Sequence, residues 1–291
     1  VPPMPDAPEA SPYGQQAGDP YAGYAPVDGP EMAPLEAPQT SPPLGAPAPP
    51  SDPSASYQSL GDLPAQAGAS FDQTLPAIYQ ALERDDLPRA HAMLSTWYRE
   101  PSLTAEQSAK VNQLLSQLAG TVVYSTEHRL EPAYTVQPGE TLEAVAARYN
   151  VPWRLLAKIN GVQTADAVQP GQTLKVIRGP FAAVVDATNN ELVLLLDGKY
   201  AGKFPVQLSG AAQQEGQWKV ADKPQPQPPA LPGMPPSEKQ LVLKDELGAA
   251  TIVIGGAGGS PLERGRVSVA SRDLDELHDI LSVGSQVVIK R

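Results

Sequence analysis

The four-residue sequence Val-Gln-Pro-Gly occurs at residues 136–139 and again at 168–171, and this pair constrains the local fold more than any other feature. Strand-forming residues adjoin both copies, Tyr134–Val136 at the first and Leu174–Val176 after the second. The chain between the copies is long enough for two short helices. The spacing therefore predicts a small β-α-α-β unit, which is too small to carry an enzyme active site and is suited to gripping an extended polymer.

The residues between the two copies supply helix signals in the right order. Gly139 permits a tight turn, and Thr141 is placed to cap the first helix. Pro152 favours the start of a second helix and Gly161 favours its end. Apolar residues recur at helical spacing on both helices and predict a shared core. They are Leu142, Val145, Ala146, Tyr149, Leu156 and Ile159.

Residues 133–177 resemble a LysM domain, a carbohydrate-binding module of bacterial wall proteins. The matching stretches are Tyr134–Leu142, Ala146–Asn150, Leu155–Gly161 and Val168–Leu174. The resemblance implies binding of N-acetylglucosamine-containing glycans, chiefly peptidoglycan, in a shallow groove between two loops. The residues that it assigns to the groove are Gly139, Glu140, Thr141 and Leu142 on one side and Asn160, Gly161, Val162 and Gln163 on the other.

Two qualifications follow from the residues themselves. Glu140 stands where the family usually has Asp, a change that would weaken a polar contact. Gly139, Thr141 and Gly161 would also be needed for turns and caps in a module that binds nothing, so a purely structural role stays open for each.

Residues 1–70 are rich in proline, alanine, glycine and serine, and contain eight of the chain's 32 acidic residues but no Lys or Arg. Such a segment buries too little apolar surface to offset its chain entropy, so we expect a disordered spacer. Binding of a proline-motif partner is the alternative, since Pro-x-x-Pro occurs there. The remaining chain is nearly neutral, which argues against nucleic acid as a partner.

Residues 71–128 have helical periodicity. Leu75, Ile78 and Leu82 predict a first helix, Pro88 the first turn of a second, and Thr104 the cap of a third. One turn resembles a tetratricopeptide helix pair, but an array needs about three repeats. We favour a small helical adaptor packed on its neighbour, with Trp97 in its core.

From residue 180 the pattern is that of strands. We expect strands at Phe181–Ala187, Glu191–Leu196, Tyr200–Leu208, Gln217–Val220, Gln240–Leu243, Thr251–Ile254 and Gln286–Lys290. Asn189-Asn190 and Asp197-Gly198 favour turns between strands. Ser271 is placed to cap one helix that ends before Gly284, and Pro224–Pro236 forms a proline-rich loop.

Residues 180–291 resemble an L,D-transpeptidase catalytic domain, on the stretches Pro180–Val206, Glu215–Lys223 and Ser271–Arg291. The family's chemistry uses a Cys nucleophile and a His. Where the Cys is expected the chain reads Gly265-Arg266-Val267-Ser268, and Gly255–Gly259 occupies the place of the His. Ser268 has no base nearby in sequence. The glycine run lacks the spacing of a phosphate-binding loop.

Composition excludes further chemistry. The chain has no cysteine, and its three histidines are far apart, so we expect neither a metal nor a cofactor. We find no apolar run long enough to span a membrane and expect an exported protein of the periplasm or cell wall, with its signal peptide already removed.

These patterns predict an α+β multidomain protein: a spacer (1–70), a helical adaptor (71–128), a LysM domain (132–178) and a degenerate transpeptidase-like β domain (180–291). The leading hypothesis is non-catalytic peptidoglycan binding. The alternatives are an active L,D-transpeptidase and an envelope scaffold in which the β domain and the helical adaptor bind protein partners.

Overall fold

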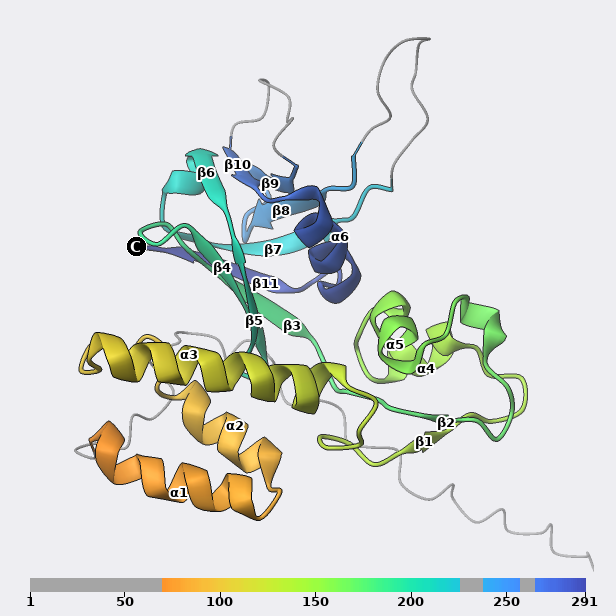
Figure 1. Cartoon of the computed structure of the whole chain (residues 1–291). Helices are drawn as coiled ribbons and strands as arrows, with labels where there is room; N and C mark the ends of the chain where they lie inside the picture. The colour runs from red at the N-terminus through yellow and green to blue at the C-terminus, as the bar shows by residue number, and fades with distance from the viewer. Residues whose placement is uncertain (1–69, 226–237, 257–264) are drawn as a thin grey trace, which may run out of the picture. The chain divides into compact units, whose positions relative to one another are not determined.

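The computed structural model describes residues 70–225, 238–256 and 265–291 (Figure 1), and all of them belong to one compact unit. The expected disordered spacer lies outside the described residues except at Ser70. The expected proline-rich loop lies outside them except at Pro224 and Gln225.

Three helices form where the apolar periodicity predicts them: α1 (Phe71–Glu83), α2 (Leu87–Ser95) and α3 (Ala105–Ala119). Thr104 caps α3 as expected, because its hydroxyl accepts a hydrogen bond from the Gln107 amide at 3.2 Å while the Gln107 side chain accepts one from the Thr104 amide at 2.9 Å. Trp97 is buried against Phe71, with ring centroids 5.4 Å apart. A π-helical turn, Gly120–Tyr124, prolongs α3 beyond the end that Gly120 suggested.

The C-terminal part contains nine strands in one sheet, in the order β5-β4-β3-β11-β7-β8-β9-β10-β6. The strands are β3 (Phe181–Asp186), β4 (Glu191–Leu196), β5 (Lys199–Pro205), β6 (Gln207–Gly210), β7 (Gly216–Asp222), β8 (Leu241–Asp245), β9 (Thr251–Gly255), β10 (Gly265–Ser268) and β11 (Gln286–Lys290), and the helix is α6 (Ser271–Ile280). Only Val206 separates β5 from β6 in the chain, although they occupy opposite ends of this order. The sheet therefore curls towards a barrel.

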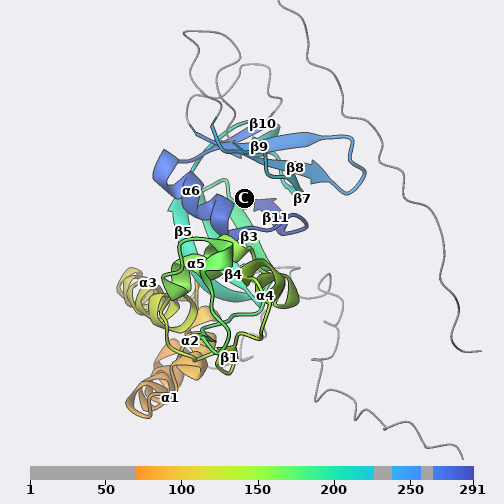
Figure 2. The same cartoon turned by 90° about the vertical axis from the view of Figure 1, so that its right-hand side faces the viewer.

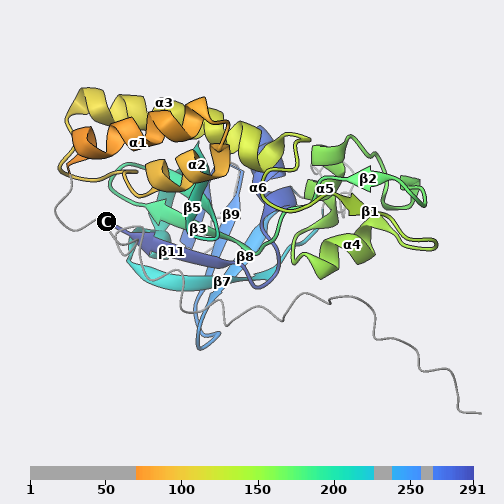
Figure 3. The same ribbon diagram turned by 90° about the horizontal axis from the view of Figure 1, so that it is seen from below.

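Strands β3 and β4 are apolar along almost their whole length because both of their faces are covered. Ala182 and Val184 face α1–α3, together with Val193 of β4. Alternate residues such as Val185 and Leu194 join the other core, which includes the apolar face of α6. Figures 1 and 3 show the helices α1–α3 on one side of these strands, as the predicted adaptor packed on a neighbour requires.

Several predicted boundaries were wrong. Tyr200–Leu208 is two strands, because the chain leaves one sheet edge at Pro205, which has no N–H to donate, and joins the other edge at Gln207. Helix α6 begins at Ser271, with Ala270 rather than Ser271 at the cap. Strand β10 was missed, because it is short and depends on pairing with β9 and β6.

The small module comprises β1 (Tyr134–Thr135), α4 (Leu142–Arg148), α5 (Trp153–Asn160), a 3-10 turn (Ala165–Ala167) and β2 (Thr173–Leu174). Figure 2 shows α4 and α5 beside β1, and Figure 3 shows β1 next to β2, with which it pairs. An ion pair between Lys158 of α5 and Asp279 of α6, at 2.7 Å, joins the module to the larger sheet domain. The α+β fold class is confirmed. None of the helices in the described ranges has the length and apolar character that a membrane span requires.

Candidate functional site

The two Val-Gln-Pro-Gly copies fold into the same turn. The Glu140 amide donates to the Gln137 carbonyl at 3.1 Å, and Gly139 has φ +79°. In the second copy the Gln172 amide donates to the Gln169 carbonyl at 2.9 Å, and Gly171 has φ +83°. Proline followed by a glycine of positive φ is the pattern of a type II turn. The two turns are cross-linked, since Val136 exchanges backbone hydrogen bonds of 2.9 Å with Gly171 and Gln172.

Glu140 holds the first turn by its side chain. Its Oε2 accepts hydrogen bonds from the Gln137 amide at 3.0 Å and from the Tyr134 hydroxyl at 2.6 Å, and its Oε1 pairs with Arg148 at 2.8 Å. These donors, the Tyr134 hydroxyl foremost, lower the pKa of the Glu140 carboxyl. Its carboxylate is therefore committed to the module's own structure.

In the rest of the first loop, Thr141 caps a helix and Leu142 belongs to the hydrophobic core. Thr141 caps α4 as expected, with its Oγ1 accepting from the Ala144 amide at 3.3 Å. Leu142 is fully buried. Its side chain belongs to the core, so only its backbone is available to a ligand, whereas Gly139 is exposed.

Asn160, the first predicted residue of the second loop, is tied to its neighbours by three hydrogen bonds. Its Nδ2 donates to the carbonyls of Leu156 at 2.8 Å and Lys175 at 2.9 Å. Its Oδ1 accepts from the Lys175 amide at 2.7 Å. The side chain thus joins the end of α5 to the segment that directly follows β2.

Gly161 and the two residues after it complete the second loop. Gly161 ends α5 in the left-handed conformation, with φ +65°, as its position predicted. The Val162 amide donates back to the Ala157 carbonyl at 2.9 Å, and the Val162 side chain packs on the core. Gln163 is exposed.

Both loops present backbone N–H groups that the protein itself does not use. Across the described part of the chain, the amides of Gly139, Thr141 and Gln163 have no hydrogen-bond partner. An exposed N–H of this kind is available to an acceptor on a ligand, such as the carbonyl oxygen of an acetamido group.

Lys175 is a structural residue that the sequence did not reveal. It is 1% exposed, and its Nζ donates to the carbonyls of Val122 at 2.9 Å and Ser125 at 3.0 Å. It therefore anchors the small module to the segment that follows α3. In an extended chain, side chains alternate between two faces, so Lys175 should point away from the core that buries Leu174 and Val176. Nothing in the sequence indicates that the face bearing Lys175 is also covered by protein.

The free energy of unfolding is expected to rise as the pH is raised from about 8 towards 10. Burial lowers the pKa values of Lys175 and Lys223 to about 8, from 10.5 in an unfolded chain. Between these values the unfolded state binds more protons, so deprotonation favours the folded state. Above about pH 10 the direction reverses, because burial raises the pKa of Tyr98 to about 12 and the unfolded chain ionises first. Urea denaturation across this range measures the profile.

The variant Lys175→Met is the control for this profile. It removes one of the two lysines, so its rise in the free energy of unfolding between pH 8 and 10 should be smaller than that of the native chain. A native profile that is flat or falling in this window would contradict the expectation.

A second candidate site lies where β9 and β10 run parallel, at the place where a transpeptidase would carry its nucleophile. Arg266 is 7% exposed, and its Nε and Nη2 donate to the Gly256 carbonyl at 2.9 and 2.6 Å. A Cβ built on Gly255 would lie 2.4 Å from this guanidinium, and one on Gly256 would lie 2.1 Å from Oε2 of Glu238. Each glycine therefore leaves room for the end of a charged side chain, which would have to shift if a larger residue replaced the glycine. The rest of the expected glycine run, residues 257–259, lies outside the described residues.

Comparisons with known proteins bear on both sites. The LysM domain family model matches residues 134–176. No curated protein matches the chain. Among solved structures, the chain is similar to an L,D-transpeptidase from Mycobacterium smegmatis (14% identity, TM-score 0.28), with 42% of this chain and 64% of that one covered.

Two further structures are similar. An L,D-transpeptidase from Stackebrandtia nassauensis has 17% identity and a TM-score of 0.29, covering 47% of this chain and 75% of that one. The catalytic domain of the E. faecium L,D-transpeptidase has 15% identity and a TM-score of 0.27, covering 38% and 97%. The match to the M. smegmatis protein spans less than two thirds of that protein. The segment 134–176 of this chain is a LysM domain.

Proposed function

We propose that this protein binds peptidoglycan in the cell envelope without catalysis, by holding N-acetylglucosamine-containing glycan between the two loops of its LysM domain. The observation that carries the proposal is the set of amides at Gly139, Thr141 and Gln163 that have no hydrogen-bond partner among the described residues, on the two loops that the resemblance assigns to the groove. A neutral sugar with acetamido groups offers the acceptors that such amides need.

Eight residues were predicted to line this groove, and we retain them with different roles. Gly139, Thr141, Gly161 and Gln163 would present backbone and exposed surface. Glu140 and Asn160 would hold the loops in shape, while Leu142 and Val162 would contribute through their backbones.

The absence of catalysis is supported by the residue found where the nucleophile is expected. The chain contains no cysteine, so a thiolate nucleophile is excluded, and Arg266 occupies the expected position. A guanidinium remains protonated at any physiological pH and cannot attack an acyl donor. The glycan-binding domain is then the part with a nameable ligand, and protein partners of the sheet domain form a separate proposal.

The exposed Gln163 side chain lies beside the backbone amide of the same residue and would donate a further hydrogen bond to the sugar. Gln163→Ala keeps the backbone N–H but removes this side-chain donor, so it should weaken binding to isolated sacculi roughly two- to tenfold, since a neutral hydrogen bond contributes about 0.5–1.5 kcal/mol. The Gln163 side chain is exposed and has no hydrogen-bond partner among the residues that the structure describes, so the change should leave stability within about 0.5 kcal/mol. Co-sedimentation of the purified chain over a range of sacculus concentrations measures the effect.

Gln113→Ala is a matched control, because Gln113 is an exposed glutamine on α3, far in sequence from the groove. It should bind like the native chain. Native protein that stays in the supernatant would refute the proposal. Deleting the LysM domain is a poorer test, since Lys175 and Lys158 both bond to other parts of the fold.

A further inference from the structure

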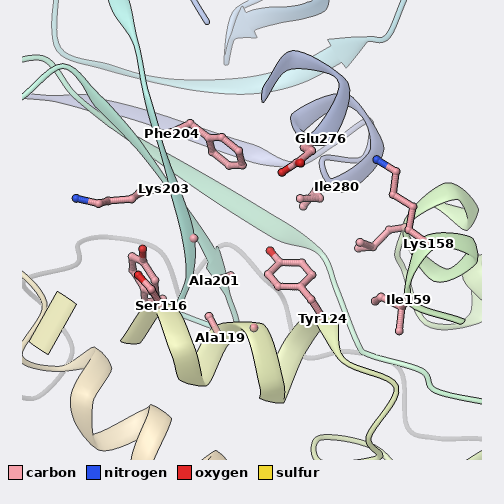
Figure 4. A pocket seen from close by; sticks show the side chains of 14 residues that line it. Ser116, Ala119, Tyr124, Lys158, Ile159, Ala201, Lys203, Phe204, Glu276 and Ile280 are labelled. Carbon is pink, nitrogen blue, oxygen red and sulfur yellow. The ribbon is translucent and has the colours of Figure 1, made fainter. Parts of the chain in front are cut away.

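A cavity of about 480 Å³ lies at the meeting point of α3, α5, β5 and α6, and the LysM family model does not account for it. Its volume falls in the range of small-molecule sites. Figure 4 shows its lining, which includes the rings of Tyr124, Tyr200 and Phe204 and the aliphatic side chains of Ile159 and Ile280. Segments far apart in the sequence build it together.

The two lysines at the cavity are already neutralised. Lys158 pairs with Asp279 at 2.7 Å, and Lys203 pairs with Glu191 at 2.9 Å. In Figure 4 the Lys203 amine extends away from Phe204 and Tyr124. Neither ammonium group is therefore free for an anionic ligand.

Glu276 is the remaining charged residue that lines the cavity. Among the described residues its one ion pair is with Arg272, at 3.9 Å, and the Arg272 side chain is 89% exposed. Such a surface pair contributes little. Figure 4 shows the Glu276 carboxylate on the cavity side of α6, opposite the Tyr124 ring.

The Tyr124 hydroxyl is a second polar group at the cavity. No hydrogen bond to it is found within the described ranges, and Figure 4 shows it directed into the cavity. Burial, and to a lesser extent the charge of Glu276, raises the pKa of this hydroxyl well above its usual value. It therefore stays protonated.

We propose that this cavity binds a primary ammonium group carried on an aliphatic stem. The Glu276 carboxylate pairs with the ammonium, the Tyr124 and Phe204 rings lie against it, and Ile159 and Ile280 cover the stem. A cation is attracted both by a carboxylate and by the faces of aromatic rings. A neutral or anionic ligand of the same length gains neither interaction.

Two sources offer this chemistry: a free diamine, and the side-chain amine of a diamino acid in a wall peptide. The second source would place a peptide contact beside the glycan groove, because α5 lines the cavity and also ends at Asn160 and Gly161. The ammonium site does not depend on the proposed glycan binding.

Calorimetric titration of the full chain with 1,5-diaminopentane tests the proposal. Saturable binding is expected, with little or none for 1,5-pentanediol or glutarate. Glu276→Gln should weaken it about tenfold or more, since a charge-assisted hydrogen bond contributes about 1.5–3 kcal/mol. Tyr124→Phe keeps the ring and should weaken binding less. The exposed Glu83→Gln of α1 is a matched control and should bind normally.

Soluble wall peptides with the side-chain amine free or acetylated separate the two sources. Binding of the free form alone identifies a peptide ligand, whereas binding of diaminopentane but neither peptide identifies a small diamine. Diaminopentane that fails to bind, or that binds Glu276→Gln as well as the native chain, would overturn the proposal. Native-like thermal unfolding of the variant excludes misfolding, and sacculus binding by the same variant tests glycan recognition separately.

Discussion

Replacing Asn160 with alanine is expected to lower the free energy of unfolding by about 2–4 kcal/mol. The side chain satisfies both backbone groups of Lys175 and the carbonyl of Leu156, which lies in the last turn of α5. Removing it leaves both backbone groups of Lys175 without a partner in a partly buried site, and each unsatisfied group costs about 1–3 kcal/mol. Urea denaturation followed by circular dichroism measures the change.

Gln163→Ala is the matched control for this prediction, because Gln163 lies three residues away, is exposed, and makes no internal side-chain bond. Its unfolding midpoint should stay near that of the native chain. An Asn160→Ala midpoint equal to that of the control would show that the three hydrogen bonds contribute nothing net. Loss of sacculus binding by Asn160→Ala reports a deformed loop, so only variants such as Gln163→Ala test direct contact.

Local chemistry made much of the small module predictable. The turn at Gly139, the cap at Thr141 and the helix end at Gly161 each depend on neighbours within a few residues, and each forms as expected. Asn160 was different, since an asparagine at the end of a helix suits either a ligand or a cap. Its partner Lys175 lies fifteen residues further along the chain, and only the fold brings them together.

Tertiary packing explains what the sequence could not reveal. The apolar runs of β3 and β4 predicted strands, but not that α1–α3 would cover one face and the α6 side the other. The cavity could not be predicted from the sequence either, because α3, α5, β5 and α6 form it together. Tyr124 and Glu276 lie far apart in the sequence, and nothing in the sequence pattern placed them opposite each other.

The two positions at which the transpeptidase resemblance predicted catalytic residues share one geometric description. The guanidinium of Arg266 occupies space that a side chain at position 255 would need, and Glu238 occupies the space beside Gly256. A histidine at either position would collide with a charged group. Glycine at positions 255 and 256 therefore leaves room for the Arg266 and Glu238 side chains, and a larger residue at either position would require the end of one of these side chains to move.

Arg266→Cys is accordingly expected to give no transpeptidase activity. The thiol would lack an activating base, because the chain's histidines lie elsewhere: His91 bonds to the Tyr200 carbonyl, His128 is exposed before the LysM domain, and His278 is on α6. The variant should also lose about 2–4 kcal/mol of stability, since the Gly256 carbonyl loses two buried donors and a cavity remains. Intact-protein mass spectrometry with a wall-peptide donor detects a thioester, and urea denaturation measures stability.

The double variant Arg266→Cys with Gly256→His distinguishes a missing base from a blocked site. Adding the histidine should not rescue turnover, because its Cβ would lie 2.1 Å from Oε2 of Glu238 and must displace that carboxylate. Arg266→Ala, which has the same cavity but no thiol, controls for stability and should unfold at a similar urea concentration. Cross-linked product from the single Arg266→Cys variant would show that a base is within reach, and the proposal of a non-catalytic domain would then fail.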